Sequence, residues 1–206
     1  MFNNFYNGAD EKTRTSTDKS PLPPQGSAST NSATSAQVTQ TDTKFLPKTQ
    51  ANMHIIPIGT DTPYQHVTTM QEDAVQAVID GTGPETLFMV EHPSVYTMGS
   101  SSTDSDLKNI GDIPVVHTGR GGKVTYHGPG QRVVYPILDL KQRERDVRKY
   151  ISNLQQWLID SLADVGVQAF AQDDVGVWVK SPAGDEKIAA IGVRIRRWVT
   201  FHGIAL

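Results

Sequence analysis

The sequence has 206 residues, a formal net charge of −3 at pH 7 and no cysteine, which excludes a disulfide framework and a thiolate metal site. The negative net charge gives no overall basic field that would favour nucleic acid as a partner. No apolar run approaches the roughly 18 residues of a membrane span, and the N-terminus lacks a signal-peptide pattern, so we expect a cytoplasmic protein that does not bind membranes.

Residues 1–50 differ in composition from the rest of the chain. Their stretch STDKSPLPPQGSASTNSATSAQVTQTDT is rich in Ser, Thr, Gln and Pro and has almost no large apolar side chains. Such a segment cannot bury enough apolar surface to offset the entropy lost on ordering. We therefore expect a disordered tail at 1–50 and one folded domain at 51–206.

The folded domain is predicted to begin with a short apolar strand at 54–59 and a helix at 61–81. Thr62 can cap this helix, Pro63 suits its first position and Gly81 can end it. Its apolar face is expected to be formed by Val67, Met70, Val75, Val78 and Ile79.

The middle of the domain is predicted to be rich in strands. A buried strand is expected at 85–92, a mostly irregular stretch at 93–112 and another strand at 113–119. In KVTYH, apolar and polar side chains alternate as on a strand with two different faces, and RVVYPILDL is apolar on both faces, as a central strand is. Pro136 runs against that prediction, because proline cannot donate to the strand ladder.

The strongest helical pattern runs from Asp146, which can cap the helix, to Gly166, which follows its end. Its apolar stripe is expected to be Val147, Ile151, Leu154, Trp157, Leu158, Leu162 and Val165. VGVWVK and KIAAIGVRI then predict two strands joined by the turn SPAGDE, and WVTFHGIAL predicts a further strand. We expect an α/β or α+β domain with a mixed sheet flanked by helices.

The segment GRGGKVTYHGPGQ concentrates glycines around Arg120 and His127. Its backbone N–H groups could face an anion or a carbonyl, or the segment could be a loop with tight turns. It is neither a dinucleotide-binding fingerprint nor a phosphate-binding loop ending in Gly-Lys-Ser/Thr, so both of those interpretations are weak.

Two side chains stand out as candidates for chemistry. His127 ends a strand beside glycines and could orient a carbonyl, carry a proton or simply be structural; the histidines show no metal-binding pair. Lys187 begins a strand that continues with small residues. It is either exposed at a turn or a functional cation that could stabilise a thiolate, a carboxylate or a phosphate.

Basic side chains gather in two places. One group is Arg194, Arg196 and Arg197, and the other, near the start of the long helix, is Lys141, Arg143, Arg145, Arg148 and Lys149. Both could be solvated faces. On a chain of negative net charge, such local patches suit an acidic protein partner at least as well as nucleic acid.

Several separated motifs together resemble a known family. RGGKVTYHGPGQ, followed by a strand ending YPILDL, is similar to the signature of the octanoyltransferases of lipoate biosynthesis. EHPSVYTMG upstream, and DDVGVWV and KIAAIGVRIRRWVTFHGIAL downstream, agree with that family in order and spacing. The resemblance covers residues 54–206, and nothing in the first 50 residues matches the family.

The resemblance implies the fold of the biotin/lipoate ligase-like catalytic domain and an activity without cofactors or metals. Such enzymes move an octanoyl group from octanoyl-acyl carrier protein to a lysine of a lipoyl domain, in 2-oxoacid dehydrogenase complexes or the glycine cleavage H protein. The acyl group rests on an enzyme cysteine as a thioester. A lysine that matches Lys187 lowers the pKa of that cysteine.

The resemblance also implies the residues that bind the acyl group. They are Arg120, Gly121, Gly122, Lys123, Val124, Thr125, Tyr126 and His127, then Ala190, Ile191 and Gly192, then Gly203, Ile204 and Ala205. Small residues would let the acyl chain pass close to the backbone, and N–H groups of a glycine-rich loop would face the carbonyl oxygen where negative charge develops. Arg194, Arg196 and Arg197 would suit docking of the acidic carrier protein.

The sequence departs from the family in one respect. The family cysteine lies in a Pro-Cys-Gly-like motif downstream of FHGIAL, and these 206 residues contain no cysteine. We therefore expect about the last quarter of the family domain to be absent and this chain not to form the acyl-enzyme. The alternatives are a non-catalytic module that binds acyl groups or carrier protein, and an ATP-dependent lipoate or biotin ligase on the same fold.

Overall fold

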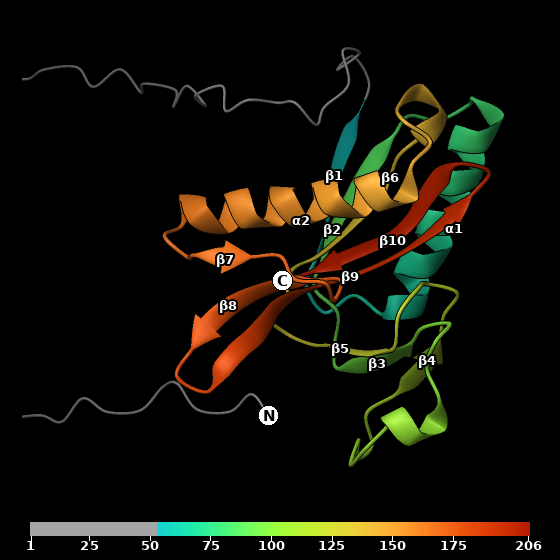
Figure 1. Cartoon of the computed structure of the whole chain (residues 1–206). Coiled ribbons are helices and arrows are strands. Elements are labelled where there is room, and N and C mark those ends of the chain that lie inside the picture. The colour runs from blue at the N-terminus through green and yellow to red at the C-terminus, as the bar shows by residue number, and fades with distance from the viewer. Residues whose placement is uncertain (1–52) are drawn as a thin grey trace, which may run out of the picture. The chain divides into compact units, whose positions relative to one another are not determined.

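The computed structural model describes residues 53–206, so the tail predicted at 1–50 lies outside the described residues. Strands, two α-helices and two 3₁₀ turns follow one another along this part of the chain (Figure 1). In chain order they are β1 (His54–Gly59), α1 (Tyr64–Asp80), β2 (Thr86–Val90), β3 (Val95–Met98), η2 (Asp104–Asp106), β4 (Val115–His117), β5 (Val124–His127), β6 (Val133–Ile137), η3 (Leu140–Gln142), α2 (Val147–Asp164), β7 (Ala169–Phe170), β8 (Val177–Ser181), β9 (Gly184–Arg196) and β10 (Val199–Ala205).

A seven-stranded mixed sheet forms the body of the domain, with strand order β1-β2-β6-β10-β9-β8-β7. Only β1 and β2 pair in parallel in this sheet; the other neighbours are antiparallel. A second sheet of three strands, β4-β3-β5, lies beside it. The predicted mixed sheet flanked by helices is confirmed.

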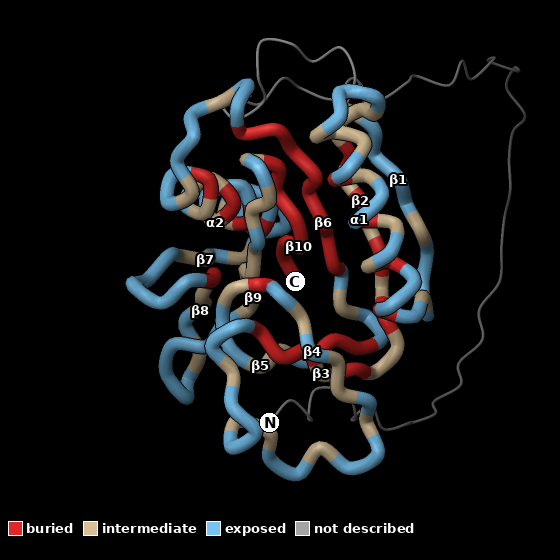
Figure 2. The backbone as a smooth tube through the Cα atoms, turned by 90° about the vertical axis from the view of Figure 1, so that its right-hand side faces the viewer, coloured by how far each residue is buried: buried red, intermediate tan, exposed pale blue. Residues whose placement is uncertain are grey.

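Each face of the large sheet is covered by one helix. Val67 and Val75 of α1 pack in one core cluster with side chains of β2, β6 and β10. Leu154 and Leu158 of α2 pack in a second cluster with side chains of β6, β8, β9 and β10. In Figure 2 the buried strands β6 and β10 run between the two helices. β6, apolar on both faces, is the central strand that its sequence predicts.

The helix ends and faces differ in part from the predictions. Gly81 ends α1 in the left-handed conformation and Asp146 caps α2, as expected. Thr62 is not a cap: Pro63 holds the N-cap position without a side-chain hydrogen bond, and the Thr62 hydroxyl donates to the carbonyl of Thr60.

The predicted apolar stripe of α2 is displaced. Tyr150 is buried there, whereas Trp157 and Val165 are 37% and 73% exposed. The spacing of apolar residues could not predict that Tyr150 belongs to the buried face, because tyrosine carries a polar hydroxyl and was not counted as apolar.

The stretch 93–112 is mostly irregular, as predicted, but it contains the short strand β3 at 95–98. β3 is the middle strand of the small sheet. It pairs with β4 and β5, which begin 20 or more residues further along the chain. Long-range pairing of this kind leaves no local pattern in a strand of four residues.

Pro136 lies in the central strand, where β6 and β10 separate. The ladder between them ends at the pair Ile204–Val134 and resumes further along, where the Thr200 N–H donates to the Leu138 carbonyl and the Leu138 N–H donates to the Thr200 hydroxyl. The N–H that proline lacks therefore falls in a gap of the ladder. Gly203 faces this gap, since a Cβ there would overlap the Val134 carbonyl and the Pro136 ring.

Candidate active site

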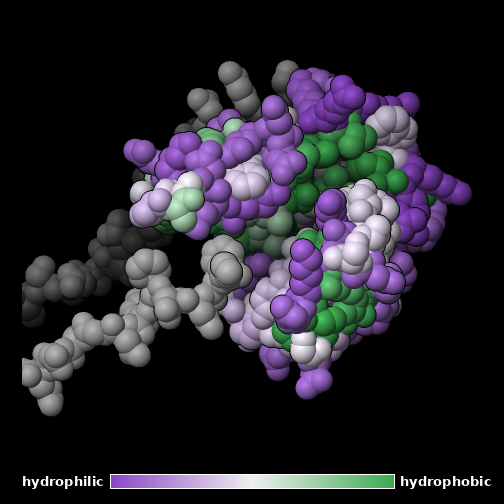
Figure 3. Space-filling view, turned by 60° about the horizontal axis from the view of Figure 1, so that its bottom comes forward, coloured by the Kyte–Doolittle hydropathy of each residue, from purple (hydrophilic) through white to green (hydrophobic). Residues whose placement is uncertain are grey.

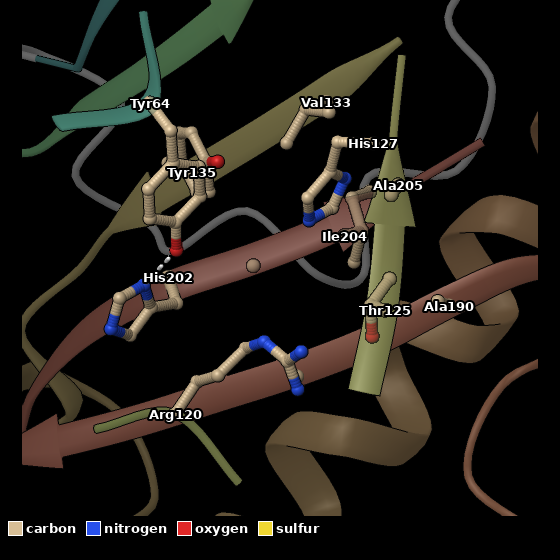
Figure 4. A pocket seen from close by; sticks show the side chains of 12 residues that line it. Tyr64, Arg120, Thr125, His127, Val133, Tyr135, Ala190, His202, Ile204 and Ala205 are labelled. Carbon is tan, nitrogen blue, oxygen red and sulfur yellow. Dashed lines mark hydrogen bonds between the residues drawn. The ribbon is translucent and has the colours of Figure 1, made fainter. Parts of the chain in front are cut away.

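A hollow lies where the small sheet and the start of α1 meet β6, β9 and β10. It encloses about 310 Å³ of empty space, including the part open to solvent. In Figure 3 apolar surface is visible in a recess between hydrophilic rims, and Figure 4 shows side chains around an open centre. The hollow is lined by Tyr64, Arg120, Thr125, His127, Val133, Tyr135, Ala190, Gly192, His202, Gly203, Ile204 and Ala205.

Arg120 places a buried cation on this wall. Its guanidinium donates to the carbonyl and hydroxyl oxygens of Thr97, both at 2.7 Å, and to the carbonyl of Gly121 at 3.0 Å. Within residues 53–206 it forms no ion pair, and burial holds its pKa below the ordinary value. A buried guanidinium held by neutral acceptors favours a ligand with an oxygen that carries or gains negative charge.

Close backbone approach to Arg120 explains part of the glycine pattern. A Cβ at Gly99 would overlap the Gly122 carbonyl and approach the Arg120 guanidinium to 2.8 Å. One at Gly192 would lie 3.0 Å from the Arg120 side chain. Glycine at these two positions therefore leaves room for the Arg120 side chain. At Gly192 it also means that no side chain projects into the hollow.

His127 is held at the end of β5 by its neighbours. Its Nδ1 lies 2.6 Å from the Gln131 Oε1, and its ring stacks on Tyr64 at 6.1 Å between ring centroids. Burial lowers the pKa of His127 to about 4, partly opposed by the hydrogen bond to Gln131. The imidazole is therefore neutral at pH 7.

His202 on β10 was not among the predicted site residues. It has a left-handed backbone at φ 58°, and its N–H donates to the Oε1 of buried Gln71 at 3.0 Å. Its Nδ1 lies 3.5 Å from the Tyr64 hydroxyl, and burial lowers its pKa to about 4. Strained backbone of this kind is concentrated at functional sites. Only its place before Gly203 in the FHGIAL motif pointed to it in the sequence.

Tyr64, Val133 and Tyr135 were also missed. Val133 and Tyr135 belong to the strand predicted to be apolar on both faces, and Tyr64 was not on the predicted apolar face of its helix. Burial raises the pKa of Tyr64 to about 12, and the pKa of Tyr135 is also raised, so both hydroxyls keep their protons at pH 7. The Tyr135 hydroxyl lies 2.8 Å from Nε2 of His92, a buried histidine behind the wall. The polar part of the hollow is therefore neutral except for Arg120.

The predicted acyl-binding stretches come together from the segment that leads into β5 and from the hairpin of β9 and β10, which is distant from it in sequence. Strand pairing places Ala190 opposite Ala205 and Gly192 opposite Gly203. Of the fourteen predicted positions, those on the wall of the hollow are Arg120, Thr125, His127, Ala190, Gly192, Gly203, Ile204 and Ala205. Those off it are Gly121, Gly122, Lys123, Val124, Tyr126 and Ile191.

Lys187 does not line the hollow. It is exposed on β9, where its Nζ donates to the Val175 carbonyl at 3.1 Å and lies 4.8 Å from the centre of the Trp178 ring. A bulge on β9 places both Ile188 and Ala189 in the core cluster under α2. Because side chains otherwise alternate along a strand, Lys187 lies on the face of β9 away from α2. This is the same face from which Ala190 lines the hollow.

The two basic groups differ in their surroundings. Arg143 and Lys149 of the second group pair with the acidic side chains of Glu85 and Glu144. In the first group, Arg194 is exposed and its guanidinium lies over Gly119, beside the hollow. Arg196 donates to the backbone carbonyl of Glu72, and Arg197 is exposed in the turn between β9 and β10.

Residues 53–206 contain no cluster of three or more His, Cys, Asp or Glu side chains placed to hold a metal ion. Neither α1 nor α2 is long and apolar enough to cross a membrane.

Sequence comparisons point to one family. Residues 63–206 match the family model of the lipoyl protein ligase A/B catalytic domain. An octanoyltransferase of Parvibaculum lavamentivorans is 50% identical over 149 residues, which are 70% of this chain and 66% of that protein. An octanoyltransferase of Rickettsia peacockii is 50% identical over 147 residues, or 69% of this chain and 70% of that protein. The chain thus spans about two thirds of the length of these curated relatives.

Solved structures share the fold at low sequence identity. A bi-partite lipoate protein ligase from Thermoplasma acidophilum superposes with a TM-score of 0.54 and 18% identity, over 75% of this chain and 60% of that one. A lipoate-protein ligase A bound with ATP gives 0.53 and 16% identity, over 75% and 66%.

Proposed function

The chain belongs to the lipoyl protein ligase A/B catalytic-domain family and is a homologue of octanoyltransferases, and from this premise we propose that it takes part in transferring an octanoyl group from octanoyl-acyl carrier protein to a lipoyl-domain lysine. The acceptors would be the lipoyl domains of 2-oxoacid dehydrogenases and the glycine cleavage H protein, in the cytoplasm. The observation that carries the proposal is a hollow with a largely apolar lining and one buried cation.

The hollow suits an acyl thioester in both of its parts. Val133, Ile204 and Ala205 offer apolar surface to an alkyl chain. The Arg120 guanidinium lies where it can stabilise the negative charge that develops on a thioester carbonyl oxygen during acyl transfer. Because the other polar groups are neutral, this single cation sets the sign of charge that the hollow accepts.

The proposed thioester intermediate needs a cysteine that these 206 residues do not supply. We propose that this cysteine lies beside Lys187, on the face of β9 that also carries Ala190. Lys187 and Ala190 are about 10 Å apart along the strand. Its stem crosses Gly176 and its ammonium group is held over Trp178, which limits its freedom. A cation fixed in this way would lower the pKa of a cysteine thiol placed beside it.

Carrier protein is proposed to dock on Arg194, Arg196 and Arg197. Arg194 lies beside the hollow, and its charge adds to burial and Arg120 in lowering the pKa of His202. An acidic carrier protein on this surface would bring its thioester to the open side of the hollow.

Mass spectrometry of a lipoyl domain incubated with octanoyl-acyl carrier protein tests the function. We would compare this chain alone with this chain fused to a segment that carries the Pro-Cys-Gly-like motif. We expect no octanoylation with the chain alone and octanoylation with the fusion, reduced at least tenfold by Lys187→Ala.

The same assay separates the alternatives. Octanoylation by the chain alone would contradict the need for a cysteine. An inactive fusion whose hollow still binds octanoyl groups would favour a non-catalytic binding module. Exchange of pyrophosphate with ATP in the presence of lipoate would instead indicate a ligase.

A further inference from the structure

Gln131 is brought back to His127 by the turn between β5 and β6. Pro129 and Gly130 occupy the two central positions of this turn, and the Gln131 N–H donates to the Gly128 carbonyl at 3.1 Å. Gly130 has φ 83°, which the third residue of a type II turn requires. The sequence HGPGQ thus places an amide side chain against the histidine that precedes it by four residues.

The orientation of the Gln131 amide is fixed by both of its ends. Its NH₂ group donates to the Tyr126 carbonyl at 3.3 Å, and its Oε1 lies 2.6 Å from Nδ1 of His127. In the flipped orientation the Gln131 amide oxygen would face the Tyr126 carbonyl oxygen, and the two oxygens would repel each other. Because Oε1 can only accept, Nδ1 must carry the imidazole proton.

The other nitrogen of His127 is left for the hollow. Nε2 has no hydrogen-bond partner among residues 53–206, and Figure 4 shows the ring projecting toward the open centre. The groups that face this ring are Tyr64, His92 and the Arg120 guanidinium. Burial and the nearby positive charge both keep the ring neutral, so Nε2 carries a free lone pair.

We propose that Gln131 is a positioning residue that locks His127 in the Nδ1–H tautomer, so that Nε2 stands in the hollow as a proton acceptor for acyl transfer. The role in transfer rests on the proposed function. During aminolysis the lysine nitrogen forms a C–N bond to the acyl carbon while the C–S bond breaks. The proton lost by nitrogen passes to Nε2 and then to the leaving thiolate, which returns the imidazole to its neutral form.

Nitrogen NMR of the imidazole rings in the 206-residue chain tests the tautomer directly. At pH 7 we expect the His127 proton on Nδ1, with His127→Gln used for assignment. Gln131→Leu removes the acceptor and should lower the ratio of the Nδ1–H to the Nε2–H form by about tenfold, the effect of losing one hydrogen bond. Gln131→Glu keeps an acceptor and should preserve the tautomer.

A matched control is Gln156→Leu, the same change at an exposed position on α2, which should leave the His127 signals unchanged. A proton on Nε2 in the unmodified chain, or the same tautomer ratio in Gln131→Leu, would overturn the proposal. If Gln131→Leu does not fold, the unmodified chain and Gln131→Glu still decide it.

Addition of octanamide tests the acceptor role. Its amide N–H should donate to Nε2 and shift that resonance, and the shift should be smaller in Gln131→Leu. Octanamide bound in the hollow without a shift of Nε2 would contradict the acceptor role. Failure of octanamide to bind in the hollow would contradict the proposed function, while the tautomer measurement would stand.

Discussion

At the scale of single residues, the hollow combines one buried cation with neutral histidines. Arg120, His127 and His202 are each less than 9% exposed. The sequence motifs pointed to Arg120 and His127, because both belong to one contiguous stretch. His202 was missed although it belongs to the FHGIAL motif, since its importance comes from a left-handed backbone and from the distant Tyr64 and Gln71.

These histidines make stability depend on pH. The pKa values of His127 and His202 are each lowered to about 4 in the fold, against 6.5 when unfolded. Below pH 6.5 the unfolded chain therefore binds more protons than the folded chain, so the free energy of unfolding decreases as the pH is lowered. Between pH 7 and pH 5 each histidine should lower the free energy of unfolding by about 2 kcal/mol.

Urea denaturation of His127→Gln and His202→Gln at the two pH values checks this prediction. Each variant should lose about 2 kcal/mol less than the unmodified chain on acidification. An equal loss in all three proteins would show that the buried histidines are not responsible.

At the scale of elements, strands with a strong local pattern were predictable and the weak ones were not. β6 is apolar on both faces and was predicted as central, and the hairpin of β8 and β9 followed from its turn. β3 and the two-residue β7 were not predicted, because such short strands are defined by the strands that they pair with and not by their own sequence pattern. The bulge at Ile188, which decides the direction of Lys187, also has no sequence signal.

The gap between β6 and β10 predicts a sharp difference in stability between substitutions at two of the predicted acyl-binding glycines. Gly203→Ala places a methyl group against the Val134 carbonyl and the Pro136 ring, and should lower the free energy of unfolding by about 3 kcal/mol. Gly121→Ala is the matched control, because its Cβ would lie 3.4 Å from the nearest atom, the Val193 carbonyl oxygen. Its cost should stay below about 1 kcal/mol. Equal costs in urea denaturation would contradict the close approach.

At the scale of the whole molecule, β5 and the β9–β10 hairpin, which are distant from each other in sequence, build one wall of the hollow. The basic side chain of Arg194 lies beside this wall. The family and its fold were predictable from four ordered motifs and are confirmed. The motifs could not show which members of each stretch face the hollow, because that depends on strand register. They also could not show that Lys187 lies outside it.

The basic surface predicts an electrostatic contribution to carrier-protein binding. Arg194→Glu should weaken binding of octanoyl-acyl carrier protein by about tenfold at low salt, and the difference should shrink as salt screens the charges. Arg148→Glu, the same change at an exposed position on α2, is the control and should have little effect. Titration calorimetry measures both, and equal weakening by the two variants would place the docking surface elsewhere.

Nuclear Overhauser contacts between octanamide and labelled methyl groups test most directly whether the twelve-residue hollow holds the octanoyl group. Contacts are predicted to the methyl groups of Val133 and Ile204. The internal control is a second, surface hollow, lined in part by Val179 and Ile188. Contacts to that pair, or to neither pair, would contradict the account.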